Sequence, residues 1–381
     1  MRFPFFLGLI LPLSIGVSLG CSKSSRPGDG GSDSAVDGRI DVGPPDSTLD
    51  STLDTTTDAG ETCECLEGPH LDHIYLISDG GEIWTYDPSL DEYEFVVGPV
   101  CGGATPFSMA VDTEGVAWIN IVDSMGVLNL DLLDPGPCTE SPYLRTNPDF
   151  GLFGMSFASN SATDFCSDLY VMTYSGDGAF DEGPDLGKLG VIDPDTGDIR
   201  ELANTNFDGG ELTGTGDGRL FGFAGDDPVK LVEYDRETGA LLDTIELTGV
   251  RKTNASAAAF YAGDIWLFTE AVPDECEPCL MAECGDDLIA CRADEVCNDH
   301  LECVLTSARM TDDCGGFLTE EVRTCVSTCT SCSIAPRFRV SRLIRFDLDN
   351  SEGGGFTDIA QRAPIRVVGA ASSPCVPTEP F

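Results

Sequence analysis

Basic residues and histidines are scarce in this chain. Its 21 lysine and arginine residues stand against 66 aspartate and glutamate residues, which gives a formal net charge of −45. Such a charge repels the phosphates of nucleic acids and the anionic surface of a bilayer. We therefore expect no nucleic-acid partner and no docking on a membrane surface. Solubility and self-repulsion are the simplest explanation of the acidity.

Histidine, a residue of many catalytic centres, is scarce, and the common catalytic motifs are absent. Only three histidines occur, His70, His73 and His300, so a histidine-based triad or metal centre has little material. No G-x-S-x-G motif, P-loop or dinucleotide-binding fingerprint is present. We expect a protein that is not an enzyme.

One long apolar run exists, and it lies at the N-terminus. Arg2 is followed by a mostly apolar stretch from 3 to 19, the order of a secretory signal. The stretch ends in "VSLGC", which resembles the bacterial lipobox, although Ser18 stands where leucine is more usual. The resemblance implies a signal peptide over residues 1–20 and a lipid on Cys21. An uncleaved membrane anchor and an ordinary cleaved signal are the alternatives.

Residues 21–62 are rich in Ser, Thr, Asp and Gly and nearly free of large apolar side chains. Such a segment cannot bury enough surface to offset the entropy of ordering, so we expect a disordered acidic tether. Ser22, where an aspartate would retain a lipoprotein at the inner membrane, implies an outer-membrane lipoprotein that faces the periplasm or the cell exterior. The lipid would then be its only membrane contact.

From residue 63 to 273, short apolar strands alternate with Gly, Asp and Pro turns, which is an all-β pattern. Three strand types recur about every 45 residues: one rich in small residues, one with an aromatic side chain and one that ends in aspartate. The small-residue segments are 106–112, 153–159, 211–217, 255–261 and 366–372. The aromatic residues are Tyr75, Trp118, Tyr170, Phe221 and Trp266. The aspartates are Asp87, Asp131, Asp193, Asp235 and Asp347.

Five copies of each type predict a five-bladed β-propeller, with six blades as the alternative. The small-residue strand fits the crowded innermost position, and the aromatic side chains would fill the space between blades. The first blade lacks an inner strand before residue 73. We therefore expect residues 338–381 to supply the end of blade five and the strand that completes blade one.

Several segments resemble a family of secreted or lipid-anchored β-propeller proteins abundant in myxobacteria. They are "PFSMAVDTEGVAW", "FGMSF", "ELTGTGDGRLFGF" and "VVGAASSPC". The resemblance covers residues 66–270 and 338–376. It implies the fold and an exported location, but no activity, because none is established for that family.

The chain has 17 cysteines, so an even number remains beside the predicted lipid carrier. Even numbers are typical of oxidised, exported proteins. Ten of these cysteines lie in residues 274–337, between the strand of Trp266 and the strand that ends at Asp347: Cys276, Cys279, Cys284, Cys291, Cys297, Cys303, Cys314, Cys325, Cys329 and Cys332. We expect a helical insertion held together by disulfides.

Two C-x-x-C pairs at the ends of this insertion also fit a zinc site. That interpretation leaves six cysteines to pair among themselves, and an oxidising location disfavours free thiolates. A thioredoxin-type redox role would need a βαβ setting, which is absent from the sequence pattern. Zinc and redox chemistry are therefore the alternatives to disulfides.

Outside the insertion, a bridge from Cys63 or Cys65 to Cys375 would lock the shared first blade. Cys138 and Cys166 form the second predicted pair, because both fall near the turns on one face, in neighbouring blades. Cys101 would then pair with whichever of Cys63 and Cys65 is not bonded to Cys375.

Carboxylates offer two further hypotheses. The aspartates at the strand ends open turns such as "DPDTGD", which favours local hydrogen bonding over a calcium site. We expect no cofactor, with structural calcium as the alternative. Five-bladed propellers include glycosidases with paired carboxylates, for which Glu211 is the candidate channel carboxylate and Asp208 a second one; Asp112 and Asp217 fall at the opposite strand ends.

The combined expectation is a monomeric, surface-displayed lipoprotein that binds a protein or polysaccharide of the cell envelope without catalysis. The insertion would lie on the propeller face that commonly binds partners. A carbohydrate-binding or glycoside-hydrolysing propeller is the alternative, and a purely structural role in the envelope is a third. The sequence does not identify the ligand.

The disulfide interpretation predicts few reactive thiols. We expect almost no cysteine of the denatured, unreduced protein to react with a thiol reagent, because the cysteines are oxidised. We also expect the protein to release no zinc. Thiol titration with metal analysis checks this. Several reactive thiols together with bound zinc would contradict it.

Overall fold

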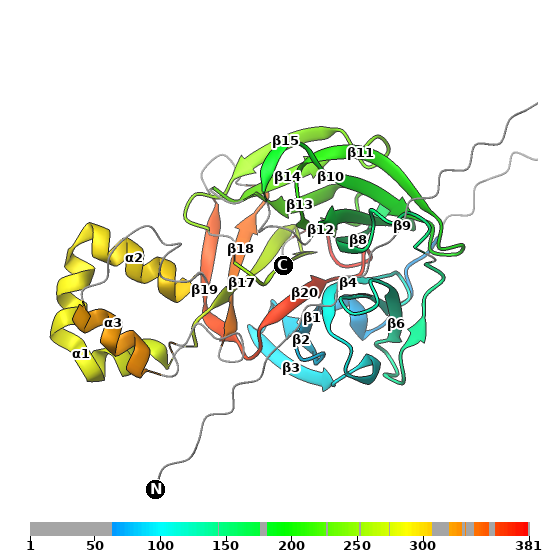
Figure 1. Ribbon diagram of the computed structural model, residues 1–381. Helices are drawn as coiled ribbons and strands as arrows, with labels where there is room; N and C mark the ends of the chain where they lie inside the picture. The colour runs from blue at the N-terminus through cyan, green and yellow to red at the C-terminus, as the bar shows by residue number, and fades with distance from the viewer. Residues whose placement is uncertain are drawn as a thin grey trace, which may run out of the picture. The chain divides into compact units, whose positions relative to one another are not determined.

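The computed structural model describes residues 63–379 apart from 144, 176–180, 226–227, 251–252, 274, 307–319, 330–331, 333–338 and 350–354. Strands β1 to β20 form five antiparallel sheets of four strands each, arranged around a common axis (Figure 1). The predicted all-β, five-bladed propeller is therefore confirmed, and the six-bladed alternative is wrong. The expected signal peptide, Cys21 and the tether lie outside the described residues.

Within each blade we letter the strands A to D from the axis outwards. Blade 1 contains β20 (Val367–Ala371), β1 (Ile74–Ser78), β2 (Ile83–Asp87) and β3 (Glu92–Val97). Blade 2 contains β4 (Pro106–Val111), β5 (Val116–Ile121), β6 (Val127–Asp131) and β7 (Thr139–Glu140). Blade 3 contains β8 (Leu152–Ser161), β9 (Asp164–Tyr174), β10 (Glu182–Ile192) and β11 (Ile199–Phe207).

Blade 4 contains β12 (Gly210–Gly214), β13 (Leu220–Ala224), β14 (Lys230–Tyr234) and β15 (Leu241–Glu246). Blade 5 contains β16 (Ser256–Tyr261), β17 (Asp264–Ala271), β18 (Val340–Asp347) and β19 (Phe356–Ala363). Short 3-10 turns at Pro69–Leu71 and Cys101–Gly103 precede β1 and β4.

The small residues of the A strands allow neighbouring blades to approach closely at the axis. A Cβ atom on Gly154 would lie 2.0 Å from the carbonyl oxygen of Gly210, and one on Gly214 would lie 2.1 Å from the carbonyl oxygen of Phe157. Both distances are far inside van der Waals contact. The strands β8 and β12 therefore need glycine at these positions to pack as they do.

Hydroxyl groups of the A strands tie one blade to the next. In three successive contacts a serine or threonine hydroxyl accepts a hydrogen bond from a backbone N–H of the following A strand. The pairs, hydroxyl first, are Ser108 with Met155 (3.3 Å), Ser156 with Gly214 (2.8 Å) and Thr213 with Phe260 (2.7 Å). We call these the inner-strand hydroxyl bonds. They satisfy buried donors that no strand partner within the blade reaches.

The C-terminal strand closes the ring. Strand β20 pairs with β1, with Ala371 opposite Tyr75, so the two ends of the described chain share blade 1. A disulfide between Cys65 and Cys375 joins the segments outside these strands. This closure supplies the fourth strand of blade 1, without which β1 would be an unpaired edge.

Aromatic residues of the B strands are buried, with Trp118 and Phe221 at 4% and 2% exposure. The Trp118 ring meets Phe157 of the next blade edge-on at 5.7 Å, and Trp266 meets Tyr86 of blade 1 at 5.6 Å. They fill the space between blades, as the repeat predicted. Such contacts add to the free energy gained by apolar burial.

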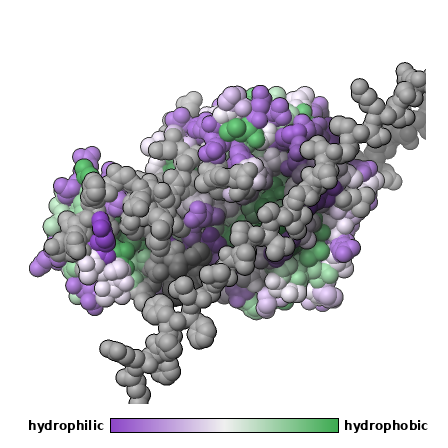
Figure 2. All heavy atoms as spheres, viewed as in Figure 1, coloured by the Kyte–Doolittle hydropathy of each residue, from purple (hydrophilic) through white to green (hydrophobic). Residues whose placement is uncertain are grey.

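The Cys-rich insertion lies between β17 and β18. It contains α1 (Cys276–Ala293), α2 (Glu295–Thr306) and α3 (Glu320–Thr328), which enclose a small core of their own. In the view of Figure 2 the insertion presents hydrophilic and hydrophobic side chains side by side. Its disulfides include Cys276–Cys332, Cys279–Cys329 and Cys291–Cys297.

Two disulfides of the ring differ from the predicted pairing. Cys166 bonds to Cys63, and Cys138 bonds to Cys101, so the predicted Cys138–Cys166 pair is wrong. The short D strand explains the difference, because Thr139 pairs with Asn129 in the middle of β6. Cys138 therefore lies beside the outer strand of blade 2, where it bonds to Cys101 of the connection between blades 1 and 2.

We predict that the closure disulfide stabilises the ring more than the short disulfide of the insertion does. Replacing both Cys65 and Cys375 by serine should cost about 2–4 kcal/mol, because this bridge restricts the unfolded chain across a separation of 310 residues. The matched control is the Cys291→Ser/Cys297→Ser variant, whose bridge spans a separation of six residues.

Tryptophan fluorescence during urea unfolding measures the difference. All three tryptophans, Trp84, Trp118 and Trp266, lie in ring strands, so their signal reports the ring and not the insertion. Equal midpoints for the two variants would contradict the prediction.

Candidate functional site

The antiparallel blades give the propeller two different faces. One is formed by the A–B and C–D turns, and we call it the AB face. The other is formed by the B–C and D–A connections, and we call it the BC face. The insertion replaces a B–C connection and therefore belongs to the BC face.

The repeated aspartates lie in the C–D turns of the AB face. The Oδ1 atom of Asp193 accepts hydrogen bonds from the N–H groups of Asp195 and Thr196, and Asp235 accepts from those of Glu237 and Thr238. Asp87 and Asp131 show the same pattern with the residues two and three positions later. The carboxylates thus stabilise the turns, in agreement with the local interpretation.

These hydrogen bonds lower the pKa of three of the aspartates, Asp87, Asp193 and Asp235. The N–H of Thr196 is the main cause for Asp193, and the hydroxyl and N–H of Thr238 are the main causes for Asp235. Donors that face a carboxylate favour its charged form. The ionised side chains are therefore part of the folded turns at neutral pH.

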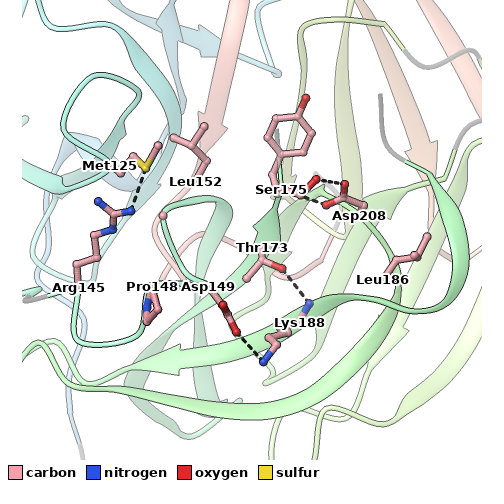
Figure 3. Close-up of a pocket in the computed structure, with 12 residues that line it drawn as sticks. Met125, Arg145, Pro148, Asp149, Leu152, Thr173, Ser175, Leu186, Lys188 and Asp208 are labelled. Carbon is pink, nitrogen blue, oxygen red and sulfur yellow. Dashed lines mark hydrogen bonds and ion pairs between the residues drawn. The ribbon is translucent and has the colours of Figure 1, made fainter. Parts of the chain in front are cut away.

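A pocket of about 430 Å³ opens on the BC face between blades 2 and 3. It is the candidate functional site. The D–A connection before β8 provides one wall, and the ends of β9 and β10 provide the other (Figure 3). Its lining residues are Met125, Arg145, Pro148, Asp149, Gly151, Leu152, Thr173, Tyr174, Ser175, Leu186, Lys188 and Asp208.

The inner part of the pocket is polar and ordered. Asp208 is 8% exposed and accepts hydrogen bonds from both the N–H and the hydroxyl of Ser175. The Thr173 hydroxyl accepts a hydrogen bond from the Lys188 N–H at 2.9 Å. These groups present oxygen atoms in fixed positions, which suits recognition of hydroxyl groups.

The outer part combines charged and aromatic side chains. The Lys188 ammonium lies 2.9 Å from Asp149 and 2.8 Å from Glu201, so it is neutralised by two carboxylates. The Tyr174 ring stacks on Phe107 of blade 2, with 5.5 Å between ring centroids and 16° between planes. Arg145 and Met125 lie on the side of the pocket opposite Ser175 and Asp208 (Figure 3).

The two candidate channel carboxylates have different surroundings. Glu211 lies on the A strand β12, and its Oε2 accepts a hydrogen bond from the Ser108 hydroxyl of β4 at 2.9 Å. Asp208 lines the pocket instead, as described above. Of the carboxylates expected at the opposite ends, Asp112 accepts a hydrogen bond from the Trp118 indole and Asp217 accepts one from the Thr215 hydroxyl.

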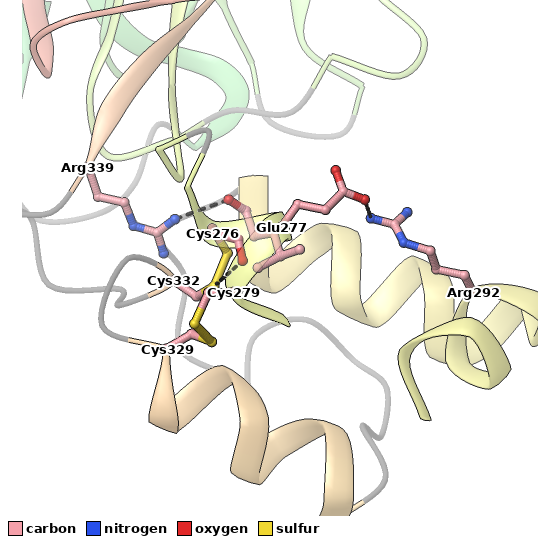
Figure 4. The surroundings of a disulfide bond; sticks show 8 residues. Cys276, Glu277, Cys279, Arg292, Cys329, Cys332 and Arg339 are labelled. Carbon is pink, nitrogen blue, oxygen red and sulfur yellow. Dashed lines mark hydrogen bonds and ion pairs between the residues drawn. A yellow bond between two sulfur atoms is a disulfide. The ribbon is translucent and has the colours of Figure 1, made fainter. Parts of the chain in front are cut away.

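At the base of the insertion, the disulfides Cys276–Cys332 and Cys279–Cys329 lie next to each other (Figure 4). The four sulfur atoms of the C-x-x-C pairs are thus bonded to one another in pairs. They are not thiolates, and the zinc alternative would need both bonds to be reduced.

The other cysteines of the insertion are placed in part. Cys284 is also disulfide-bonded. Cys303 lies in α2 and Cys325 in α3, while Cys314 lies outside the described residues. Among described residues, one group has the spacing of a metal site, Cys63, Asp164 and Cys166, but its two sulfur atoms form a disulfide with each other.

Apart from Asp208, sequence reasoning missed the residues that line the pocket. The segment "RTNPDFG" before β8 contains a single basic residue in a long D–A connection, which is the only signal that could have drawn attention to Arg145. Within the part of the chain that the structure describes, no helix has the length and apolarity needed to span a membrane.

We predict that the C–D turns depend on ionised aspartate and not on calcium. The folded-state pKa of Asp235 is lowered, so its contribution to stability is complete above the unfolded pKa of about 3.9 and is lost as the pH falls through the folded value. Asp235→Ala should lower the unfolding midpoint at pH 7. Asp235→Asn keeps an acceptor but no charge, so its difference from wild type should shrink below pH 4.

Thermal unfolding between pH 3 and 7 checks this prediction, with excess calcium or EDTA added in parallel. A midpoint that rises with calcium and falls with EDTA would show that the aspartates hold a metal.

No protein-family model and no curated protein matches the chain. Among solved structures, it is similar to PorZ, a bacterial surface component of the type-IX secretion system of Porphyromonas gingivalis, with 12% identity and a TM-score of 0.31 over 54% of this chain and 23% of that one. It is similar to virginiamycin B lyase from Staphylococcus aureus, with 15% identity and a TM-score of 0.32 over 54% of this chain and 66% of that one. It is also similar to a streptogramin B lyase, with 18% identity and a TM-score of 0.31 over 53% of this chain and 64% of that one. The chain thus spans less than two thirds of each of these structures, and likeness at this level assigns no activity to it.

Proposed function

We propose that the protein is a non-enzymatic binding scaffold, displayed at the cell surface, that engages its ligand through the BC face. The observation that carries this proposal is the position of the pocket and the insertion on the same face. The chain enters the ring at the opposite face, the AB face.

The position at which the chain enters the ring supports the BC face as the binding face. Cys63 is bonded to Cys166 beside the A–B turn of blade 3, and Cys65 is bonded to Cys375 just after the end of β20. Both disulfides therefore lie towards the AB face. A tether over residues 21–62 would join the ring at that face, which would leave the BC face free for a ligand.

The extracytoplasmic location is part of the same proposal. Several disulfides cross the ring and the insertion, and such bonds persist in oxidising compartments. An outer-membrane lipoprotein of the myxobacterial propeller type, monomeric and without a cofactor, fits these bonds and the acidic composition.

The insertion is suited to be a recognition element. Its side chains Met281, Ile289 and Val296 are 45%, 58% and 65% exposed, which is unusual for large apolar residues in so small a unit. The two disulfides at its base hold it in one shape, so a partner would not bear the entropy of ordering it.

Contacts with the ring also fix the insertion. The Val272 N–H and the Arg339 guanidinium both donate hydrogen bonds to the carbonyl of Leu305 near the end of α2, at 3.2 and 3.1 Å. Arg339 is 3% exposed, and burial lowers its pKa. A buried cation at a helix C-terminus is stabilised by the carbonyl groups there, which favours a rigid joint.

Carbohydrate binding at the pocket is the second candidate. The observation in its favour is the combination of ordered oxygen atoms on Ser175 and Asp208 with the aromatic ring of Tyr174. Hydrolysis is less well supported, because Glu211 and Asp208 have separate partners and do not form a described carboxylate pair.

We predict that the insertion can be removed without loss of the ring. Ala271 pairs with Val340, so replacing residues 272–339 by the hairpin turn Asn-Gly should preserve β17 and β18. The design also removes Arg339, which would otherwise lose its partner Leu305. The variant, made in the soluble chain from residue 22 onward, should unfold cooperatively but retain less than a tenth of the binding to envelope extracts.

Pull-down from detergent-solubilised envelopes, followed by mass spectrometry and glycan analysis, gives the readout. The Cys291→Ser/Cys297→Ser variant, which keeps the insertion, is the control. Full binding by the shortened variant would remove the insertion from the proposal.

A further inference from the structure

We propose that the pocket between blades 2 and 3 binds a sugar that carries a carboxylate group, and that the Arg145 guanidinium holds this carboxylate. The proposal rests on the BC face as the binding face and names the ligand class for its pocket.

Arg145 differs from the other cations near it. It is exposed, and its Nη2 atom lies 3.1 Å from the sulfur of Met125, a weak acceptor. Cations elsewhere in the ring, among them Arg219, Lys230 and Arg366, lie within 3.1 Å of carboxylate oxygens. In a chain with 66 acidic residues, a cation without a described carboxylate partner is an open anion-binding group.

The backbone around Arg145 holds the guanidinium at the pocket. Arg145 has a φ of 48°, a left-handed conformation that non-glycine residues seldom adopt. The Tyr143 hydroxyl donates a hydrogen bond to the Phe150 carbonyl and so closes the connection that carries Arg145. Burial raises the pKa of Tyr143 to about 12, so this donor persists at physiological pH.

Gly151 provides the space for the guanidinium. A Cβ atom at this position would lie 3.1 Å from the Met125 sulfur and 3.4 Å from Arg145 Nη2. The absence of a side chain thus lets Met125 and Arg145 lie together at the lip of the pocket.

The acidic groups of the pocket do not compete for Arg145. Asp149 is bonded to Lys188, and Asp208 accepts two hydrogen bonds from Ser175. Arg145 is therefore the one lining cation whose charge is open to a ligand, among the residues described. A guanidinium presents a planar set of donors that matches a carboxylate in two parallel hydrogen bonds.

The rest of the pocket favours a sugar over a purely apolar acid. Ordered hydroxyl and carboxylate oxygens lie across from Arg145, and the Tyr174 ring, backed by Phe107, forms an apolar wall. The volume of about 430 Å³ lies in the range of small-molecule sites. It would admit about one or two sugar residues at the end of an acidic polysaccharide.

The test uses the soluble chain from residue 22 onward and galacturonate oligosaccharides of two and three residues. The matched probes are the same oligosaccharides with each carboxyl reduced to the alcohol. We expect calorimetry to show about tenfold tighter binding of the acid form, because a hydrogen-bonded ion pair is lost with the carboxyl. Arg145→Ala should weaken binding of the acid form about 10- to 100-fold, and Arg145→Lys less, because lysine keeps the charge without the planar donors.

Arg236→Ala is the control variant. Arg236 lies on the AB face, where it donates a hydrogen bond to Asn160, so its loss removes the same charge without touching the pocket. We expect unchanged affinity. Since Arg145 is exposed, its variants should keep the wild-type unfolding midpoint, which is measured alongside.

Three outcomes would overturn the inference: equal affinity for acid and reduced oligosaccharides, unchanged affinity in Arg145→Ala, or competition by inorganic phosphate at concentrations as low as those of the sugar acid. If the soluble chain captures an envelope component through the insertion but binds no galacturonate, the sugar-acid inference fails and the binding function of the BC face stands. If galacturonate binds equally well to the variant without the insertion, and that variant captures envelope components fully, the sugar-acid inference stands and the insertion is removed from the proposed function.

Discussion

The close approach of the A strands at the axis is the constraint on which the rest of this structure depends. Five blades leave so little room that a single Cβ atom on Gly154 or Gly214 would collide with the neighbouring backbone. The same crowding brings hydroxyl groups of one A strand within reach of the N–H groups of the next. The close packing thus makes the inner-strand hydroxyl bonds possible. These bonds satisfy buried donors and set the register between blades.

A ring tied together at its axis can carry variable connections at its faces. The turns of the AB face are short and stabilised by their own aspartates, whereas the connections of the BC face differ greatly in length and hold the pocket and the insertion. The disulfides near the entry of the chain lie towards the AB face. The entry of the described chain and the variable connections are therefore on opposite faces, which is the arrangement expected for the proposed tethered binding protein.

Much of the fold follows from the sequence because the constraints that produce it are local and repeated. Small residues mark the A strands, aromatic residues such as Trp118 mark the B strands, and aspartates such as Asp193 open the C–D turns. Five copies of each allowed the blades to be counted and the strand at residues 366–372 to be placed in blade 1. The helical insertion was found for the same reason, since ten cysteines interrupt an otherwise regular pattern.

The details that sequence reasoning did not find depend on where a residue lies along a blade. The pairing of Cys138 required the register of β7, a strand of two residues with no recognisable pattern. The pocket is assembled from Met125, Arg145 and Lys188, which belong to three different connections and strands and share no motif. Only the packing of blade 2 on blade 3 brings them together.

The net charge of the chain gives this pocket its physical significance. A protein with a charge of −45 repels an acidic ligand at long range, yet at physiological ionic strength charges more than about 8 Å apart are largely screened. A ligand at the pocket would therefore interact mainly with the charges nearest to it. Lys188 forms an ion pair with Asp149, and Ser175 donates a hydrogen bond to Asp208. Among the described lining residues, Arg145 is the charged group without a described ion-pair partner. An overall acidic surface would keep polyanions from binding elsewhere on the ring, so at the proposed site the Arg145 guanidinium would provide selectivity as well as affinity.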